Sequence, residues 1–242
     1  MKTLLSAFNK FPPAALSILA AVLLAACGGA SRDSTSTKET ITATPAASAT
    51  PAENLPKIVA FGDSLTAGYG LAPQESYPAL LQKMIDADGF KYEVVNAGVS
   101  GDTSAGGVRR IDWSLDAGGV RFVILELGAN DFLRGQPVSE TKKNLSDIIK
   151  RAKSRDAQVL LAGMLTTTET GHDYEVEISD AFKSLASENN VVLIPFFLEG
   201  VAGIDKLNQQ DHIHPNAEGT KLVAANVYRH LKPLLEKDSR SR

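Results

Sequence analysis

The chain has 242 residues, of which 43% are hydrophobic, and 25 Lys and Arg against 28 Asp and Glu give a formal net charge of -3. This balance is typical of one ordinary globular domain with enough apolar residues to bury a core. The balance of charges excludes a strongly basic protein of the kind that binds nucleic acids. No segment combines clusters of Lys and Arg with aromatic residues. We therefore expect no nucleic-acid partner.

The N-terminal segment has the pattern of an export signal. Two lysines precede an apolar run over 14–26, which is shorter than the roughly 20 residues needed to span a bilayer. The run ends in Leu24-Ala25-Ala26-Cys27 and resembles the lipobox of bacterial lipoproteins. This resemblance implies a signal peptide over 1–26 and a lipid on Cys27. Because Cys27 is the only cysteine, no internal disulfide is expected.

The residues after Cys27 predict a flexible tether. Ser, Thr, Ala and Pro dominate this stretch, and such a composition cannot offset the entropy of ordering the chain. We divide the chain into the signal peptide, a lipidated and disordered tether over 27–55, and a folded domain over 56–242. Gly28 in place of Asp after the cysteine favours the outer membrane, so we expect a lipid-anchored cell-envelope protein with its domain on the periplasmic side.

The folded domain alternates short apolar runs with helical segments, which is typical of a parallel sheet covered by helices on both faces. The expected strands are 58–61, 93–97, 122–127, 159–162 and 191–194. The expected helices are 77–86, 106–115, 140–153, 174–188 and 217–235. This order predicts an α/β protein, a three-layer α/β/α sandwich with a flavodoxin-like five-stranded parallel sheet in the strand order 2-1-3-4-5.

Polar residues follow several of the expected strands. Right-handed crossovers make all strands point the same way, so the loops after them gather at one edge of the sheet. Ser64 follows the first strand, Gly101 the second, Asn130 the third, and Asp211 and His214 the fifth. Each is ordinary turn chemistry when taken alone, so the hypothesis of a site depends on their meeting.

Together these residues have the chemistry of serine-dependent hydrolysis. Asp211 lies three residues before His214, so within a helix-like turn it could accept a hydrogen bond from Nδ1 while Nε2 faces Ser64. His212 competes as the base. The backbone N–H of Gly101 and the side-chain amide of Asn130 are candidate donors for an oxyanion.

No cofactor or metal is expected in this chain. The spacing of His and carboxylate residues that a metal site requires is absent. Asp63, Asp102 and Asp131 lie beside the candidate residues, and turn and loop geometry explains them.

The motifs resemble a known family. Gly62-Asp63-Ser64-Leu65, Gly101, Asn130 and Asp211-x-x-His214 are similar to the four motif blocks of SGNH (GDSL-type) hydrolases. The stretches 95–104, 126–135, 193–198 and 211–216 are most similar to the bacterial multifunctional acyl-CoA thioesterase I, lysophospholipase L1 and arylesterase group. The resemblance implies that Ser64 is the nucleophile, that Asp211 and His214 complete the triad, and that the Ser64 N–H, the Gly101 N–H and the Asn130 amide form the oxyanion hole.

The resemblance implies a serine esterase that hydrolyses small-molecule acyl esters or thioesters through an acyl-enzyme on Ser64. Apolar residues in the expected loops suit an acyl chain, namely Leu133, Pro137, Met164, Leu165, Phe196 and Phe197. For Phe196 and Phe197 a core position is the alternative. Two alternatives stay open at this point: a carbohydrate O-deacetylase on the same scaffold, and a non-catalytic binding lipoprotein. We expect the protein to be a monomer.

Overall fold

The computed structural model describes residues 55–116, 118–165 and 172–241. Its strands are β1 Lys57–Gly62, β2 Glu93–Gly98, β3 Val120–Glu126, β4 Gln158–Ala162 and β5 Val192–Ile194. Its longer helices are α2 Tyr77–Ala87, α3 Ser104–Leu115, α5 Val138–Lys153, α6 His172–Asn189 and α7 Ala217–Arg240. The short elements are α1 Ser64–Ala67, η1 Pro73–Glu75, α4 Ala129–Leu133 and η3 Asp205–Leu207. The expected signal peptide, Cys27 and nearly all of the tether lie outside the described residues.

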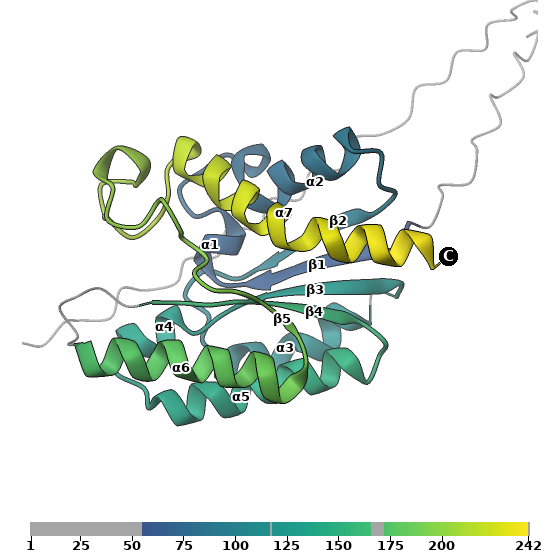
Figure 1. Cartoon of the computed structure of the whole chain (residues 1–242). Coiled ribbons are helices and arrows are strands. Elements are labelled where there is room, and N and C mark those ends of the chain that lie inside the picture. Colours follow the sequence, from purple (N-terminus) through teal and green to yellow (C-terminus); the bar gives the residue numbers. More distant parts are fainter. Residues whose placement is uncertain (1–54, 117, 166–171, 242) are drawn as a thin grey trace, which may run out of the picture. The chain divides into compact units, whose positions relative to one another are not determined.

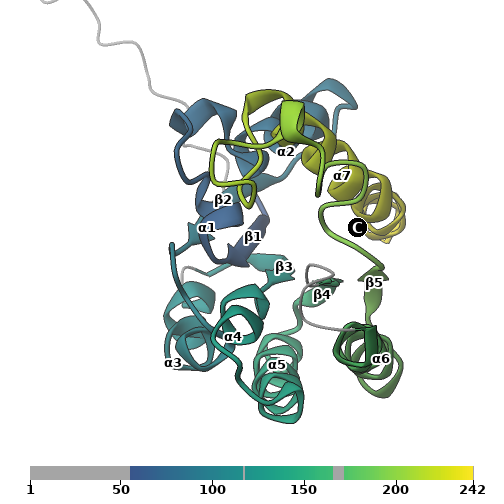
Figure 2. The same cartoon turned by 90° about the vertical axis from the view of Figure 1, so that its left-hand side faces the viewer.

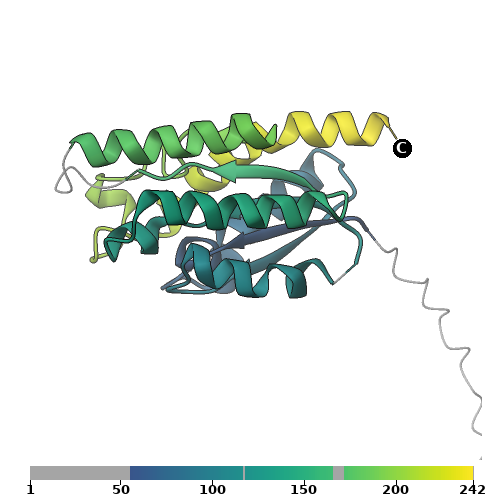
Figure 3. The ribbon, with the colours of Figure 1, turned by 90° about the horizontal axis from the view of Figure 1, so that it is seen from below.

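The sheet has the predicted topology. Its five strands are ordered β2-β1-β3-β4-β5, and every neighbouring pair is parallel. Figure 2 looks along the strands and shows this order. Helices α2 and α7 cover one face, and α3, α5 and α6 cover the other (Figures 1 and 3). The α/β/α sandwich expected from the sequence is therefore confirmed.

The central strands explain why the apolar runs do not alternate. From Ile58 to Phe61 every side chain of β1 is at most 1% exposed, and from Phe122 to Leu125 every side chain of β3 is 0% exposed. Parallel strands covered by helices on both faces read as continuous apolar runs. These two strands form the middle of the core and deliver their C-terminal ends to the same edge of the sheet.

The last helix is longer than predicted. The predicted helix ended at Leu235, but α7 extends five residues further, to Arg240. Pro233 lies inside the helix and does not end it. Its final turns are held by Asp238, which accepts hydrogen bonds from the hydroxyl of Tyr92 at 2.7 Å and from Nε of Arg121 at 2.6 Å. A tertiary contact that sequence periodicity does not reveal thus extends the helix.

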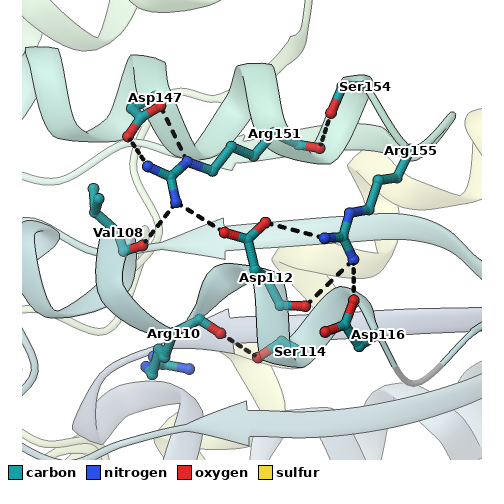
Figure 4. A network of polar contacts seen from close by, with 9 residues as sticks. All are labelled: Val108, Arg110, Asp112, Ser114, Asp116, Asp147, Arg151, Ser154 and Arg155. Carbon is teal, nitrogen blue, oxygen red and sulfur yellow. Dashed lines mark hydrogen bonds and ion pairs between the residues drawn. The ribbon is translucent and has the colours of Figure 1, made fainter.

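Ion pairs join α3 to α5 on the surface (Figure 4). Arg151 contacts Asp112 at 2.9 Å and Asp147 at 2.7 Å, and Arg155 contacts Asp112 at 3.2 Å and also Asp116. All of these side chains are more than a third exposed, where solvent and salt weaken ion pairs. We therefore expect the network to contribute little to the free energy of unfolding.

Two short helices replace loops that the sequence predicted. Helix α1 begins two residues after the end of β1, and α4 begins three residues after the end of β3 (Figure 1). Both lie at the same end of the sheet in Figures 1 and 2. They are too short for helical periodicity to predict.

Within the described part of the chain, no helix is long and apolar enough to cross a membrane.

Candidate active site

Ser64 is presented by the turn between β1 and α1. It is the first residue of α1, and the side chain of Asp63 caps that helix by accepting a hydrogen bond from the N–H of Leu65 at 3.0 Å. Gly68 ends the helix in the left-handed region with φ of 79°, a conformation that glycine adopts without strain. The result is a serine held on a rigid single turn at the C-terminal edge of the sheet.

A continuous chain of hydrogen bonds links Ser64 to Asp211. His214 Nε2 lies 2.8 Å from Ser64 Oγ, and His214 Nδ1 lies 2.7 Å from Asp211 Oδ2. The backbone between Asp211 and His214 is a turn and not the helix-like segment predicted. Its shape is fixed because Asp211 Oδ1 accepts the N–H groups of both Ile213 and His214 at 3.0 Å.

The electrostatics of Asp211 suit a charged partner for the imidazole. Burial raises the pKa of this carboxyl, but the hydrogen bonds from the backbone and side chain of His214 and from Ile213 outweigh it and lower the pKa to about 2. Asp211 is therefore ionised throughout the neutral range, and the charge favours a proton on Nδ1 of His214.

The loop that carries His214 is tied to the serine turn. Gln209 donates from its backbone to the carbonyl of His214 at 2.7 Å and from Nε2 to the carbonyl of Tyr69 at 2.7 Å. The ring of Tyr69 lies beside that of His214, with centroids 4.7 Å apart. These contacts orient the imidazole from outside the hydrogen-bonded chain, and neither Tyr69 nor Gln209 was predicted from the sequence.

The competing histidine points elsewhere. His212 has a φ of 58°, and its Nδ1 lies 3.2 Å from Asp205 Oδ1 in an exposed pair. His230 binds the carbonyl of Asn226 through Nδ1 at 2.9 Å. Among the described histidines, His214 is thus the one whose ring contacts Ser64.

Asn130 and Gly101, the predicted oxyanion donors other than Ser64, lie on segments that contact the serine turn or the end of β1. Asn130, in α4, donates from Nδ2 to Asp63 Oδ2 at 3.0 Å. Gly101 has a φ of 80°, and its carbonyl accepts from Nη2 of Arg134 at 2.9 Å. The loop before Gly101 is held to the end of β1, because the N–H of Val99 donates to the carbonyl of Gly62 at 3.0 Å. The structure therefore brings the predicted residues to one edge of the sheet.

The aspartates that turn geometry was expected to explain do more than shape turns. Asp131 accepts from the N–H and hydroxyl of Ser104 at 2.8 and 2.6 Å, which joins α4 to the start of α3. Asp102 pairs at 2.7 Å with Nε of Arg110, whose guanidinium also donates to the carbonyl of Gly62 at 2.8 Å. The prediction for these aspartates was incomplete, because their partners are distant in sequence.

Glu126 is a site residue that was not predicted from the sequence. It is 0% exposed, and its Oε2 accepts the N–H of Asp63 at 3.2 Å and lies 2.6 Å from the hydroxyl of Thr66. Burial and the neighbouring Asp63 carboxyl hold the pKa of Glu126 well above its usual range. Burial also raises the pKa of Asp63 to about 6, against hydrogen bonds from Leu65 and Asn130 that lower it. The charged side chain of Glu126 within the apolar run 122–127 was the available signal.

The apolar loop residues divide between surface and core. Leu133 is 65% exposed and Pro137 is also exposed, whereas Met164 is 3% and Phe197 0% exposed. Met164 and Phe197 belong to the core, so the expectation that they suit an acyl chain was wrong for Met164. Phe197 does line a small cavity of about 10 Å³ beside Ser64 and His214.

No cluster of His, Cys, Asp or Glu that could hold a metal occurs among the described residues.

Comparisons with known proteins agree with this geometry. Residues 60–222 match the model of the GDSL-like Lipase/Acylhydrolase family. Esterase TesA of Pseudomonas aeruginosa is 39% identical over 178 residues, which cover 74% of this chain and 89% of the relative. Thioesterase 1/protease 1/lysophospholipase L1 of Escherichia coli K12 is 37% identical over 182 residues, which cover 75% of this chain and 86% of the relative.

Solved structures agree in both fold and sequence. The crystal structure of TesA superposes with a TM-score of 0.72 at 38% identity and covers 74% of this chain and 99% of that one. AlinE4, an SGNH-hydrolase family esterase, has a TM-score of 0.63 at 43% identity and covers 74% and 97% of the two chains. With the family match and these relatives, the chain belongs to the GDSL-like lipase/acylhydrolase (SGNH hydrolase) family and is a serine ester hydrolase.

Proposed function

We propose that Ser64 is the nucleophile of this hydrolase, that His214 is its general base and that Asp211 orients the imidazole. The observation that carries the proposal is the unbroken chain from Asp211 through His214 to Ser64, with contacts of 2.7 and 2.8 Å. A weakly acidic hydroxyl becomes nucleophilic when an oriented imidazole can take its proton. Serine, histidine and aspartate in this geometry supply the nucleophile, the general base and the group that orients the base.

The reaction follows from these positions. His214 Nε2 takes the proton of Ser64 Oγ, which attacks the carbonyl carbon of an ester or thioester. The N–H groups of Ser64 and Gly101 and the amide of Asn130 donate to the oxyanion that forms. His214 then gives its proton to the departing oxygen or sulfur, leaving the acyl group on Ser64. Water repeats the cycle through His214, which releases the carboxylic acid and restores the serine hydroxyl.

We propose that the acyl group of the substrate contacts apolar side chains around Ser64. Four of them are exposed on the loops and the short helix α4 that carry the site, namely Tyr69 at 53%, Val99 at 48%, Leu133 at 65% and Ile213 at 49%. The curated relatives named as an esterase, a thioesterase and lysophospholipase L1, and an arylesterase support acyl esters and thioesters as the substrate class. A carbohydrate O-deacetylase would need a more polar surface around the serine.

An acyl-chain-length profile tests the substrate proposal. We expect kcat/KM of the full-length protein on p-nitrophenyl esters and acyl-CoA thioesters to rise from acetyl to medium chains. Leu133→Ser should reduce this gain by roughly tenfold, and Trp113→Ser, which changes a 78% exposed residue of α3, should leave it unchanged. A flat profile together with faster release of acetate from an acetylated polysaccharide would favour the O-deacetylase.

We further propose that Cys27 carries the lipid that anchors the protein to the bacterial cell envelope, at the outer membrane. The position of the sole cysteine, directly after the apolar run 14–26, supports this proposal. A lipoprotein cysteine carries more than one acyl chain, and several chains give stable membrane binding where one does not. Cys27→Ser should move the protein from the membrane fraction to the soluble fraction, while Ser64→Ala should partition like the wild type. An unchanged membrane fraction for the cysteine variant would contradict the anchor.

A further inference from the structure

Two carboxyl groups lie buried together beneath the serine turn. Asp63 is 1% and Glu126 0% exposed, and in the described residues neither forms an ion pair with Lys, Arg or His. The backbone N–H of Asp63 binds the Glu126 carboxyl directly, at 3.2 Å. Buried charges normally have a counter-charge, and two adjacent carboxyl groups without one do not both ionise. One of the two must therefore keep a proton.

The hydrogen-bond partners indicate which of the two carboxyls is charged. Both oxygens of Asp63 face N–H donors, with Leu65 N–H on Oδ1 and Asn130 Nδ2 on Oδ2, each at 3.0 Å. Glu126 has donors on one oxygen alone, because its Oε1 has no hydrogen-bond partner among the described residues. N–H donors on both oxygens stabilise a carboxylate, whereas a buried oxygen without a donor disfavours the charge.

We propose that Glu126 holds a proton in the working enzyme, and that this neutral carboxyl group is a positioning residue that leaves Asp63 as the carboxylate which orients the amide of Asn130. One N–H of that amide is bound to Asp63 Oδ2, so the other can donate to the oxyanion. The role of Asn130 as an oxyanion donor rests on the proposed function. The protonation of Glu126 does not.

The β1–β3 pairing shows how the fold makes room for this group. Gly62 lies opposite Glu126 in the parallel register, and a Cβ on Gly62 would collide with Thr66 Oγ1 and Glu126 Oε2. Glycine at this position therefore admits the carboxyl group beneath the serine turn, where it binds both the N–H of Asp63 and the hydroxyl of Thr66.

Among the described residues, no cation lowers the pKa of Glu126. Burial raises its pKa first, and the neighbouring Asp63 raises it further, against the hydrogen bonds from Thr66 and Asp63. The other titratable and charged groups that face the pair, each from a different packed element, are Tyr77 of α2, Asp102 of the loop before α3, Arg110 of α3 and His214 of the loop before α7. Arg110 is engaged by Asp102, and burial raises the pKa of the Tyr77 phenol, which stays neutral.

Infrared spectroscopy with isotope labels tests the protonation directly. The full-length protein in D₂O at pH 7 should show the band of a protonated carboxyl group that shifts when Glu side chains carry ¹³C and does not shift when Asp side chains do. Glu126→Gln should abolish the band, and Asp238→Asn, which changes an equally buried carboxyl at the other end of the sheet, should retain it. Absence of the band, or a shift with labelled Asp, would overturn the proposal without need of any variant.

Kinetics test the positioning role separately. Glu126→Gln keeps a neutral acceptor of the same shape, so its kcat should stay within about tenfold of the wild type. Glu126→Ala removes the acceptor and should lower kcat by roughly 10²-fold with KM little changed, the range expected when an oxyanion donor is misplaced. Equal loss in both variants, or a change in KM alone, would contradict positioning. Neither infrared result depends on which residue is the nucleophile, so the two proposals can fail independently.

Discussion

Buried carboxyl groups lie at both ends of the sheet and are held in opposite ways. At the N-terminal ends of the strands, Asp238 is 2% exposed and binds Arg121 and Tyr92 at 2.6 and 2.7 Å. At the C-terminal ends, Asp63 and Glu126 are as deeply buried, but within the described residues no basic side chain forms an ion pair with them.

This difference indicates that the carboxyl group at one end of the sheet stabilises the fold, whereas the carboxyl pair at the other end serves the site. A buried carboxylate with a cation and a hydroxyl is satisfied and anchors the last turns of α7. A carboxyl pair without a cation costs free energy in the folded state, and such pairs are typical of sites where an orientation or a proton is needed. Variants at the two ends should accordingly separate loss of activity from loss of stability.

The largest effect is expected at the proposed nucleophile. Ser64→Ala should lower kcat by at least about 10⁴-fold, because the remaining groups cannot form an acyl-enzyme. The free energy of unfolding should stay near the wild-type value, since the hydroxyl contributes one partly buried hydrogen bond. Steady-state hydrolysis of p-nitrophenyl esters and urea denaturation measure the two quantities, and substantial turnover in the variant would reject the assignment.

Loss of one oxyanion donor should be severe but not complete. Asn130→Ala should lower kcat by about 10²- to 10³-fold with a small change in KM, because the donor acts mainly on the charge that develops in the transition state. Comparing kcat and KM on the same ester provides the measurement. A rise in KM at constant kcat would instead indicate a role in ground-state binding.

The pH dependence of stability should distinguish the two ends of the sheet. The pKa of Asp63 is raised from 3.8 to about 6, so the folded state holds this proton more tightly and stability is lost as pH rises through that interval. Between pH 4 and 6 the wild type should lose about 2 kcal/mol relative to Asp63→Asn. Urea unfolding across this range measures the difference, and parallel curves for the two proteins would contradict the raised pKa.

At the opposite end we expect loss of stability alone. Asp238→Asn should lower the free energy of unfolding by about 2 kcal/mol, because Arg121 loses its counter-charge but is 39% exposed and can be solvated. Its kcat should be unchanged. A fall in kcat at full stability would show that the two ends are coupled.

The smallest effect is expected on the surface. Arg155→Ala removes the exposed contacts with Asp112 and Asp116 (Figure 4), and exposed ion pairs contribute about 0–1 kcal/mol. Thermal unfolding at low and high salt is the measurement. A loss comparable to that of Asp238→Asn would mean that the network supports the core.

The strands and the hydrogen-bonded chain could be predicted from the sequence because each depends on short patterns. The apolar run of β1 and the spacing of Asp211 and His214 are local, and the crossover rule brings the ends of parallel strands together. Short helices such as α1 and α4, of 4 and 5 residues, could not be predicted. Their existence depends on caps and tertiary contacts.

The carboxyl pair could not be predicted because it depends on register. Gly62 and Glu126 face each other across β1 and β3 although they are far apart in sequence, and no local pattern at either residue shows that they pair. For Phe197 the sequence left both a core position and a position near the substrate open, and in the structure it packs against Tyr77, with ring centroids 5.3 Å apart, and also lines the cavity beside Ser64. In both cases the position of the side chain depends on strand pairing and burial, which the local sequence does not show.

Labelling with a fluorophosphonate followed by peptide mass spectrometry is the most decisive test of the proposed nucleophile. We expect a single adduct on the peptide that contains Ser64, with complete loss of ester hydrolysis, and no adduct in Ser64→Ala or after mutation of His214 to Ala. An adduct on a different serine, or full activity of the labelled protein, would contradict activation of Ser64 by the chain that runs from Asp211 through His214.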